Sequence, residues 1–388
     1  MTADFPQTYF PAFSTREHEL NAYDRVDSAA KDRMLPVVTL TREREASSLA
    51  GSVASLAAAA GGRPVIVDFD PEPRPVATPE EIEIRRREKA AKREIDGKKP
   101  FVPSPKQEER YRLQRENTIE FNRSLELLKS PAGGHSAWTG LALSEPNFIP
   151  LAKLGDPAAT LGQIRAVVAA DRRIAFRIHL GVPGAVSAFL AAATGLDHPG
   201  RGILILDAGY IRDSVSVARD RVVNALAEIR KHLSPPMFDG MVKVCMAGSF
   251  PSSLTKLPGR LRIQERDLFD LVRAGWDVRY GDHASVQRRS GMEAASGWFP
   301  HVDVAHLREW HFDRSGKKSN SVGYVDAAKA VKGDAGVWGG RSTSWGTDMV
   351  ERASRGLLND GKGLKLTTPG PWVGVRVSQH LSHQAFHP

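Results

Sequence analysis

Cysteine is nearly absent from this sequence, because Cys245 is the single one among 388 residues. One thiol excludes an intrachain disulfide and every metal site built only from cysteines. Cys245 lies in the apolar run 241–246, which predicts a buried strand. We therefore interpret it as a small buried hydrophobe rather than a nucleophile.

Long apolar runs are missing as well. The apolar run 49–60 is too short to span a bilayer. Residues 1–5 include no basic segment followed by an apolar one, so no signal peptide is expected. These two absences favour a protein of the reducing cytoplasm without a membrane partner.

Familiar catalytic signatures are absent too. The sequence has no Walker phosphate loop, no H-E-x-x-H and no G-x-S-x-G. No nucleic-acid recognition motif is visible either, which makes nucleic acid the weakest of the partner hypotheses. The sequence therefore names no reaction, and no cofactor can be assigned beyond a hypothetical divalent metal.

The charge of the chain gives a mild indication. Lys and Arg exceed Asp and Glu by nine, and the pI is about 9.6. Clustered basic residues would attract an anionic partner. Because no run of like charges stands out, charge dispersed over the surface is the alternative.

What is present is an alternation of short apolar runs with amphipathic stretches, as in β/α units around a parallel sheet. Eight such strands predict a (β/α)8 barrel of the TIM type. An open doubly wound sheet is the rival, although its usual glycine-rich first turn is missing. The predicted strands are 8–13, 34–40, 64–69, 148–153, 174–180, 202–207, 241–246 and 276–280. Helices are predicted at 46–60, 160–170, 183–194, 216–232 and 264–274.

The barrel is expected over 1–290, and two segments of the chain depart from its alternation. The charged stretch 71–147 predicts a helical insertion that emerges after the third strand. We expect it over the barrel mouth, either as a structural cap or as an arm for a protein partner. Residues 291–388 predict an α+β accessory layer packed on the barrel, with a half-exposed strand at 301–312 and helices at 324–331 and 347–354.

In a (β/α)8 barrel, side chains at the carboxyl ends of the strands converge on one mouth, where we place the candidate site. The predicted catalytic residues are Asp207, Asp282 and His283. The predicted ligand-binding residues are Arg16, Lys153, Arg177, His179, Tyr210, Ser249 and Tyr280. Glu17 and Asp68 are candidate metal ligands, without a defining spacing.

Lys153, Arg177 and Asp207 stand inside otherwise apolar strands, where a charge must be paired or face a wet cavity. One interpretation is an ion-pair network. The other is an anion site, in which Lys153 and Arg177 hold a phosphate or carboxylate and Asp207 or Asp282 acts as a base or metal ligand.

The C-terminal histidines form a separate pattern. His380, His383 and His387 would share one face of a helix and could bind a metal ion. A frayed tail is the simpler interpretation, because chain termini are seldom well ordered.

The order of several short stretches resembles that of the phage-type beta protein family. The stretches are Tyr9-Phe-Pro-Ala-Phe-Ser-Thr-Arg-Glu-His-Glu-Leu20, Phe176-Arg-Ile178, Leu206-Asp207, Gly248-Ser-Phe-Pro251, Tyr280-Gly-Asp282, Ser344-Trp-Gly346 and 372–380. The resemblance implies a barrel-like fold and a role in the conflict between phages and their hosts, and it carries over no catalytic residues. His283 stands where related sequences would have an aromatic residue, and the charged insertion is a second departure.

Three functional hypotheses follow. The first is a ligand-binding or sensor protein in antiphage defence or of phage origin, which takes an anionic or phosphate-bearing ligand at the rim. The second is a phosphoester hydrolase or lyase, dependent on a divalent metal in one version. The third is a non-catalytic module that binds protein or nucleic acid.

Overall fold

The computed structural model describes residues 6–43, 45–97, 103–212, 214–251, 259–286, 300–314 and 321–387. Eight parallel strands form its central sheet, in the order β4-β3-β2-β1-β9-β7-β6-β5. A parallel bridge between Leu151 and Ala175 brings the two edges together, so the sheet is a nearly closed, TIM-barrel-like barrel. The strands are β1 (Tyr9–Ser14), β2 (Val37–Leu40), β3 (Val65–Phe69), β4 (Phe148–Pro150), β5 (Ile174–His179), β6 (Gly202–Tyr210), β7 (Val242–Gly248) and β9 (Arg279–Asp282).

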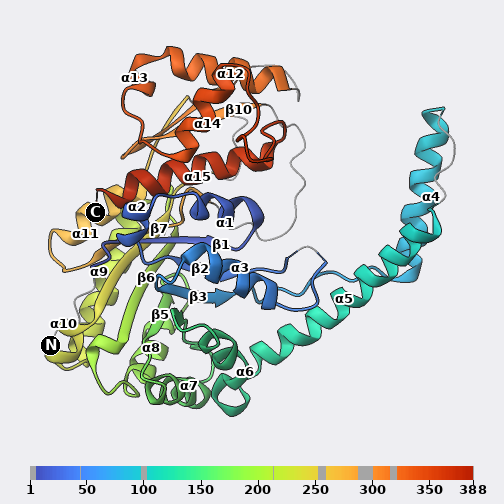
Figure 1. Ribbon diagram of the computed structural model, residues 1–388. Coiled ribbons are helices and arrows are strands. Elements are labelled where there is room, and N and C mark those ends of the chain that lie inside the picture. Colours follow the sequence, from blue (N-terminus) through green and yellow to red (C-terminus); the bar gives the residue numbers. More distant parts are fainter. Residues whose placement is uncertain are drawn as a thin grey trace.

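Helices surround this sheet (Figure 1). They are α1 (Glu17–Asp24), α2 (Ser28–Asp32), α3 (Ala50–Ala60), α6 (Ala132–Leu143), α7 (Pro157–Ala169), α8 (Ala185–Ala193), α9 (Val215–His232), α10 (Pro235–Gly240) and α11 (Gln264–Arg273), with the 3-10 turn η1 (Pro199–Arg201). Gly61 ends α3 in the left-handed conformation, φ 57°, which an L side chain rarely adopts. All eight predicted strands and the five predicted helices are present, with shifted ends.

Alternate residues of each strand point to opposite faces of the sheet, so two apolar clusters form. Side chains such as Phe10, Val37, Ile205 and Val244 fill the barrel interior. Their neighbours along the strands pack outward against the helices in a larger cluster. Toward the carboxyl ends of β5 and β6, polar side chains replace the apolar ones on the inner face.

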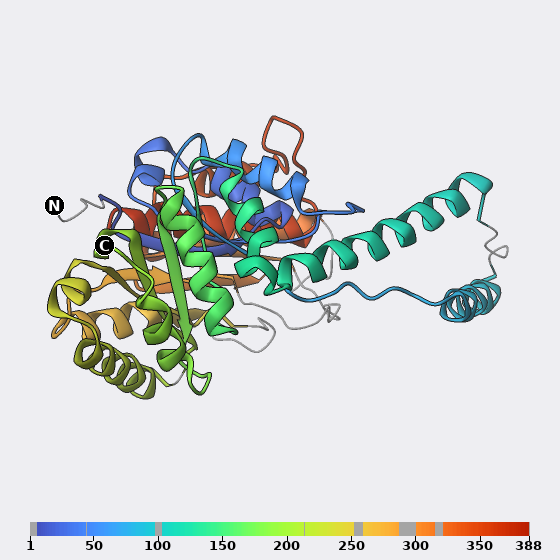
Figure 2. The same ribbon diagram turned by 90° about the horizontal axis from the view of Figure 1, so that it is seen from below.

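The insertion after β3 contains two long helices, α4 (Pro79–Ile95) and α5 (Pro105–Lys129). Each begins at a capping box with proline in the first turn, formed by Thr78 with Glu81 and by Ser104 with Gln107. Buried residues of α5, such as Phe121 and Leu125, lie in its C-terminal half. Both views show α5 running outward from the barrel, with α4 at its far end (Figures 1 and 2).

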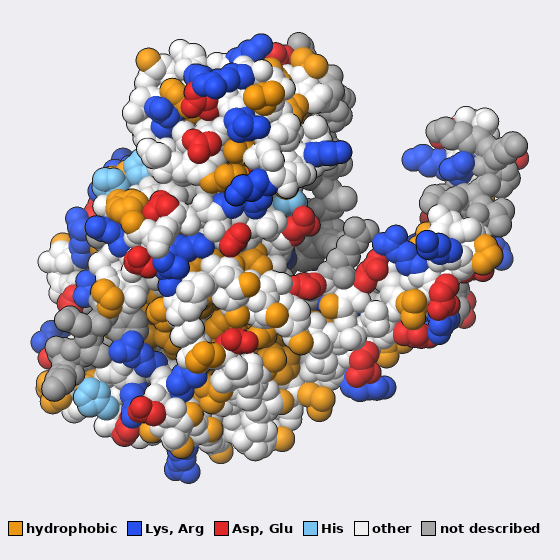
Figure 3. Space-filling view, in the orientation of Figure 1, with side chains coloured by type: hydrophobic (Ala, Val, Ile, Leu, Met, Phe, Trp, Pro, Cys, Tyr) orange, Lys and Arg blue, Asp and Glu red, His pale blue; other side chains and the backbone are white. Residues whose placement is uncertain are grey.

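Acidic and basic side chains alternate on both helices of this insertion. Several form ion pairs one turn apart, such as Arg112 with Glu116 at 2.8 Å. Figure 3 shows Lys or Arg interspersed with Asp or Glu over the arm and over the visible face of the body. On this face the excess positive charge is therefore dispersed.

The C-terminal region adds a second, antiparallel sheet of order β10-β11-β8, from β8 (Arg260–Arg262), β10 (His301–Ala305) and β11 (Glu309–Arg314). The single strand predicted over 301–312 is thus two strands, because the chain turns at 306–308 and His301 pairs with Arg314. Helices α12 (Ser321–Gly333), α13 (Ala335–Trp338) and α14 (Trp345–Ser354) pack with this sheet around their own apolar cluster.

The last helix, α15 (Pro369–Ala385), returns to the barrel. It packs against α1 and α2 and lies along β1, and Val377 and Leu381 belong to the outer apolar cluster of the barrel. The frayed tail expected around His380 is therefore wrong, since His380 is fully buried within this helix. None of the helices in the described part of the chain is long and apolar enough to cross a membrane.

Candidate functional site

The polar residues of β5 and β6 reach one place because of strand geometry. Arg177 and His179 are two residues apart on β5, so both point to the same face of the sheet. In the parallel register His179 pairs with Asp207 of β6. The three side chains therefore converge at the carboxyl end of the barrel.

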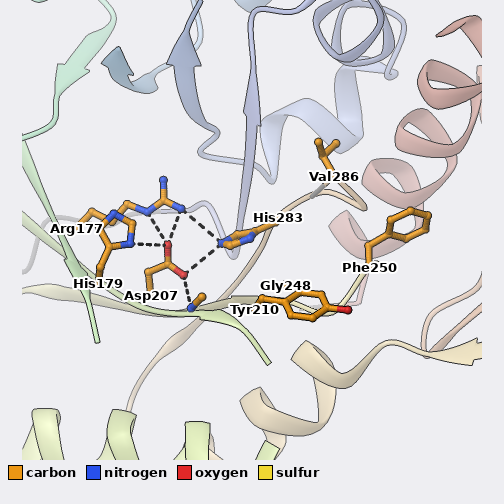
Figure 4. A pocket seen from close by; sticks show the side chains of 9 residues that line it. Arg177, His179, Asp207, Tyr210, Gly248, Phe250, His283 and Val286 are labelled. Atoms are coloured by element: carbon orange, nitrogen blue, oxygen red, sulfur yellow. Dashed lines mark hydrogen bonds and ion pairs between the residues drawn. The ribbon is translucent and has the colours of Figure 1, made fainter. Parts of the chain in front are cut away.

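Asp207 is the centre of this group. Its side chain is 1% exposed, and Oδ2 accepts hydrogen bonds from Arg177 Nε at 2.9 Å and Arg177 Nη2 at 2.6 Å. The backbone N–H of Gly209 donates to Oδ1 at 2.8 Å. His283 Nε2 lies 3.2 Å from Oδ1, and His179 Nδ1 lies 3.3 Å from Oδ2 (Figure 4).

This environment fixes the charge of Asp207. Burial alone would raise the pKa of its carboxyl group, but the Arg177 guanidinium, followed by His283 and His179, holds the pKa well below its usual range. Asp207 is therefore an ionised acceptor at neutral pH. An imidazole that donates one N–H to it keeps its second ring nitrogen for other partners.

A pocket of about 270 Å³ opens beside this group. Its lining consists of Arg177, His179, Asp207, Gly209, Tyr210, Gly248, Phe250, His283 and Val286. The pocket thus combines a wall of nitrogen donors around one carboxylate with an aromatic and aliphatic wall (Figure 4).

The shape of β6 places Tyr210 in this lining. The register between β6 and β7 shifts between Asp207 and Tyr210, and Gly209 has φ 74°, which favours glycine. Beyond the irregularity Tyr210 pairs with Gly248 of β7, and the residue is 49% exposed.

Five of the predicted site residues therefore lie together, namely Arg177, His179, Asp207, Tyr210 and His283. Lys153 and Asp68 lie elsewhere on the rim and form an ion pair with each other. Lys153 Nζ also lies 3.8 Å from the centre of the Phe69 ring. Lys153 and Arg177 thus have separate carboxylate partners, Asp68 and Asp207.

Asp282 and Tyr280 point to the outer face of β9, toward the helices. Asp282 is fully buried and accepts hydrogen bonds from Tyr9 Oη and from His380 Nε2 of α15, both at 2.8 Å. Burial alone would raise the pKa of Asp282, but His380 and the hydrogen bonds lower it. Tyr280 packs between Tyr9 and Arg266, whose guanidinium lies 3.6 Å from the centre of the Tyr280 ring.

The remaining predicted residues also lie outside the pocket lining. Ser249 is buried, and its Oγ donates to Glu265. Arg16 and Glu17 are exposed at the start of α1. Within the described parts of the chain, no group of three or more His, Cys, Asp or Glu residues could hold a metal ion.

Sequence reasoning missed part of the lining and one partner. The Gly209 N–H, Phe250 and Val286 were not predicted for the site, and neither was the bond between His380 and Asp282. The alternation along β9 carried one usable signal: residues 282 and 283 are consecutive in an extended segment, so their side chains take opposite faces.

Comparison with known proteins now adds to this geometry. A model of a family described as "Beta protein" matches residues 9–386. The chain is also similar to "Protein beta" of Enterobacteria phage P4, with 25% identity over 387 residues. That match covers 97% of this chain and 92% of the phage protein.

Proposed function

Because this chain belongs to the beta protein family, we propose that it acts in the conflict between phages and their hosts, as a barrel protein that binds an anionic ligand in the pocket beside Asp207. The phage origin of its relative supports the first part. The proposal covers both a protein of antiphage defence and a protein encoded by a phage, because the ligand chemistry of the pocket is the same in either case.

One observation carries the ligand proposal. Three nitrogen-bearing side chains, those of Arg177, His179 and His283, surround a single buried carboxylate at the pocket wall. Arg177 uses Nε and Nη2 on Asp207, while Nη1 points away from it (Figure 4). Donors thus exceed acceptors, and a phosphate or carboxylate group supplies the missing acceptor oxygens.

A thermal-shift titration tests this proposal. Inorganic phosphate, nucleoside monophosphates, sugar phosphates and dicarboxylates are each added to the wild-type chain. A ligand that binds the native state stabilises it by about 2.7 kcal/mol at one hundred times its Kd, so we expect at least one class to raise the Tm.

His179→Ala and His232→Ala form a matched pair for this titration. Both imidazoles are 47% exposed and lie within 3.3 Å of a carboxylate, but His232 contacts Glu228 on α9, away from the pocket. We expect His179→Ala to reduce the ligand-induced shift and His232→Ala to leave it unchanged. Equal shifts in the two variants, or no shift with any ligand, would contradict the proposal.

A second candidate function is a phosphoester hydrolase or lyase. The contact between His179 and the ionised Asp207 favours it, because a carboxylate that orients an imidazole supports proton transfer. Incubation of the binding ligand with the protein, with and without added Mg²⁺, tests for product formation. Binding without product would leave the ligand-binding function alone.

A further inference from the structure

The imidazoles of His179 and His283 contact different oxygens of the Asp207 carboxylate. His283 Nε2 faces Oδ1 of Asp207, and His179 Nδ1 faces Oδ2. Figure 4 shows the two rings on either side of Asp207. A reaction that removes a proton from one oxygen and delivers a proton to another needs two such groups, and histidine serves in both roles near neutral pH.

Arg177 lies between the two imidazoles. Its Nη2 is 3.5 Å from His283 Nε2 and 2.6 Å from Asp207 Oδ2. A fixed guanidinium in a buried site stabilises negative charge that develops on a phosphoryl group. The polar wall therefore holds the three groups that a phosphodiester transesterification uses: a base, an acid and a cation.

The opposite wall indicates which phosphodiester fits. The half-exposed ring of Tyr210 borders the pocket, beside Phe250 and Val286. Proteins that recognise single-stranded RNA stack unpaired bases on such aromatic rings. The pocket is near the lower end of ligand-pocket volumes, roughly 300 Å³, which suits one nucleotide unit rather than a duplex.

From this juxtaposition we infer that the pocket binds one nucleotide of single-stranded RNA and that the protein cleaves the RNA strand at the phosphate of that nucleotide, with His179 and His283 as base and acid. This inference rests on the proposed anion pocket and names its substrate class. One imidazole takes the proton of the ribose 2′-hydroxyl, whose oxygen attacks phosphorus. The bond from phosphorus to the 5′-oxygen of the next nucleotide breaks, and the second imidazole, protonated, donates its proton to that oxygen. The products are a 2′,3′-cyclic phosphate and a 5′-hydroxyl end.

An oligonucleotide assay tests the inference. A single-stranded RNA containing all four bases is incubated with the protein at several pH values, and mass spectrometry identifies the ends. We expect cyclic phosphate products, a rate that falls on both sides of an optimum pH, and no cleavage of the same sequence as DNA. Loss of one acid or base commonly costs 10²–10⁴ in rate, so we expect His179→Ala and His283→Asn each to lose about 100-fold or more.

His232→Ala, purified in the same way, should keep the wild-type rate. A wild-type rate in His232→Ala would show that replacing an exposed histidine does not by itself reduce cleavage. Loss of cleavage in His179→Ala would show that the activity does not come from a contaminating ribonuclease. His179→Ala should keep the wild-type Tm because the ring is half exposed, so a loss of rate would not reflect unfolding.

The outcomes separate this inference from the proposed function. Intact RNA together with a Tm shift by phosphate or nucleotides overturns the cleavage and leaves the anion pocket. Equal cleavage of RNA and DNA, or linear phosphate ends only, overturns transesterification. Intact RNA without any Tm shift overturns both proposals.

Discussion

Replacing Asp207 with asparagine should destabilise the protein far more than replacing an exposed aspartate. The Asp207 and Arg177 side chains are 1% and 3% exposed, so the neutral amide leaves a buried guanidinium without its counter-ion. Removing one partner of a buried ion pair costs about 3–5 kcal/mol. The measurement is the free energy of unfolding in urea, followed by tryptophan fluorescence.

Asp220→Asn is the matched control. Asp220 pairs with Arg219 at 2.7 Å, but the two side chains are 62% and 48% exposed. Exposed pairs contribute about 0.2–1 kcal/mol. If Asp207→Asn costs no more than Asp220→Asn, Asp207 does not hold a desolvated cation, and the account of the site is wrong.

A double-mutant cycle strengthens this test. Arg177→Met should cost a similar amount, because it leaves the Asp207 carboxylate buried without its main counter-charge. The double variant should cost at least about 1 kcal/mol less than the sum of the two, as expected for residues in direct contact. Strict additivity would show that the two side chains act independently.

Three further predictions follow from other contacts. Gly248→Ala would place a Cβ 2.6 Å from His283 Nδ1, so we expect it to abolish ligand stabilisation of the Tm; Gly140→Ala, where a Cβ meets nothing within 4 Å, should leave that stabilisation intact. Burial raises the pKa of Glu265 from 4.5 to about 8. Between these pH values the folded state therefore binds a proton that the unfolded state has released. The free energy of unfolding should then fall as pH rises, by at most about 1.4 kcal/mol per pH unit. Glu265→Gln should remove this dependence, and a wild-type pH profile that is already flat would contradict it. Burial raises the pKa of Cys245 to about 12, so a thiol reagent at pH 8 should label it only after denaturant is added, and rapid labelling of the native protein would refute its burial.

The sequence predicted the barrel because its strands are continuous apolar runs, whose identity does not depend on distant contacts. Strand ends were less predictable. The eighth strand was expected at 276–280 but spans Arg279–Asp282. The backbone N–H of Trp276 still donates to the carbonyl oxygen of Val272 in the last turn of α11, so the strand begins later. The charges of Arg177 and Asp207 were recognisable as a pair because they interrupt neighbouring apolar strands.

Contacts that depend on the C-terminal region could not be predicted in this way. Asp282 was assigned to the mouth from its place at a strand end, but its partner His380 lies 98 residues further along the chain. That partner is supplied by a helix whose docking position no local pattern encodes. The face of the sheet to which Asp282 points could, in contrast, have been predicted from strand alternation, once His283 had been assigned to the pocket.

The docking of α15 has a consequence for how the chain folds during synthesis. A ribosome produces β9 well before it produces α15, which follows only after the antiparallel sheet and α12, α13 and α14. Until then Asp282 lacks its hydrogen-bond partner His380, and the α1 surface that α15 covers lacks its packing partner. The nascent barrel therefore exposes the apolar surface beneath α15 while about a hundred further residues are synthesised. A C-terminal truncation would leave that surface exposed permanently.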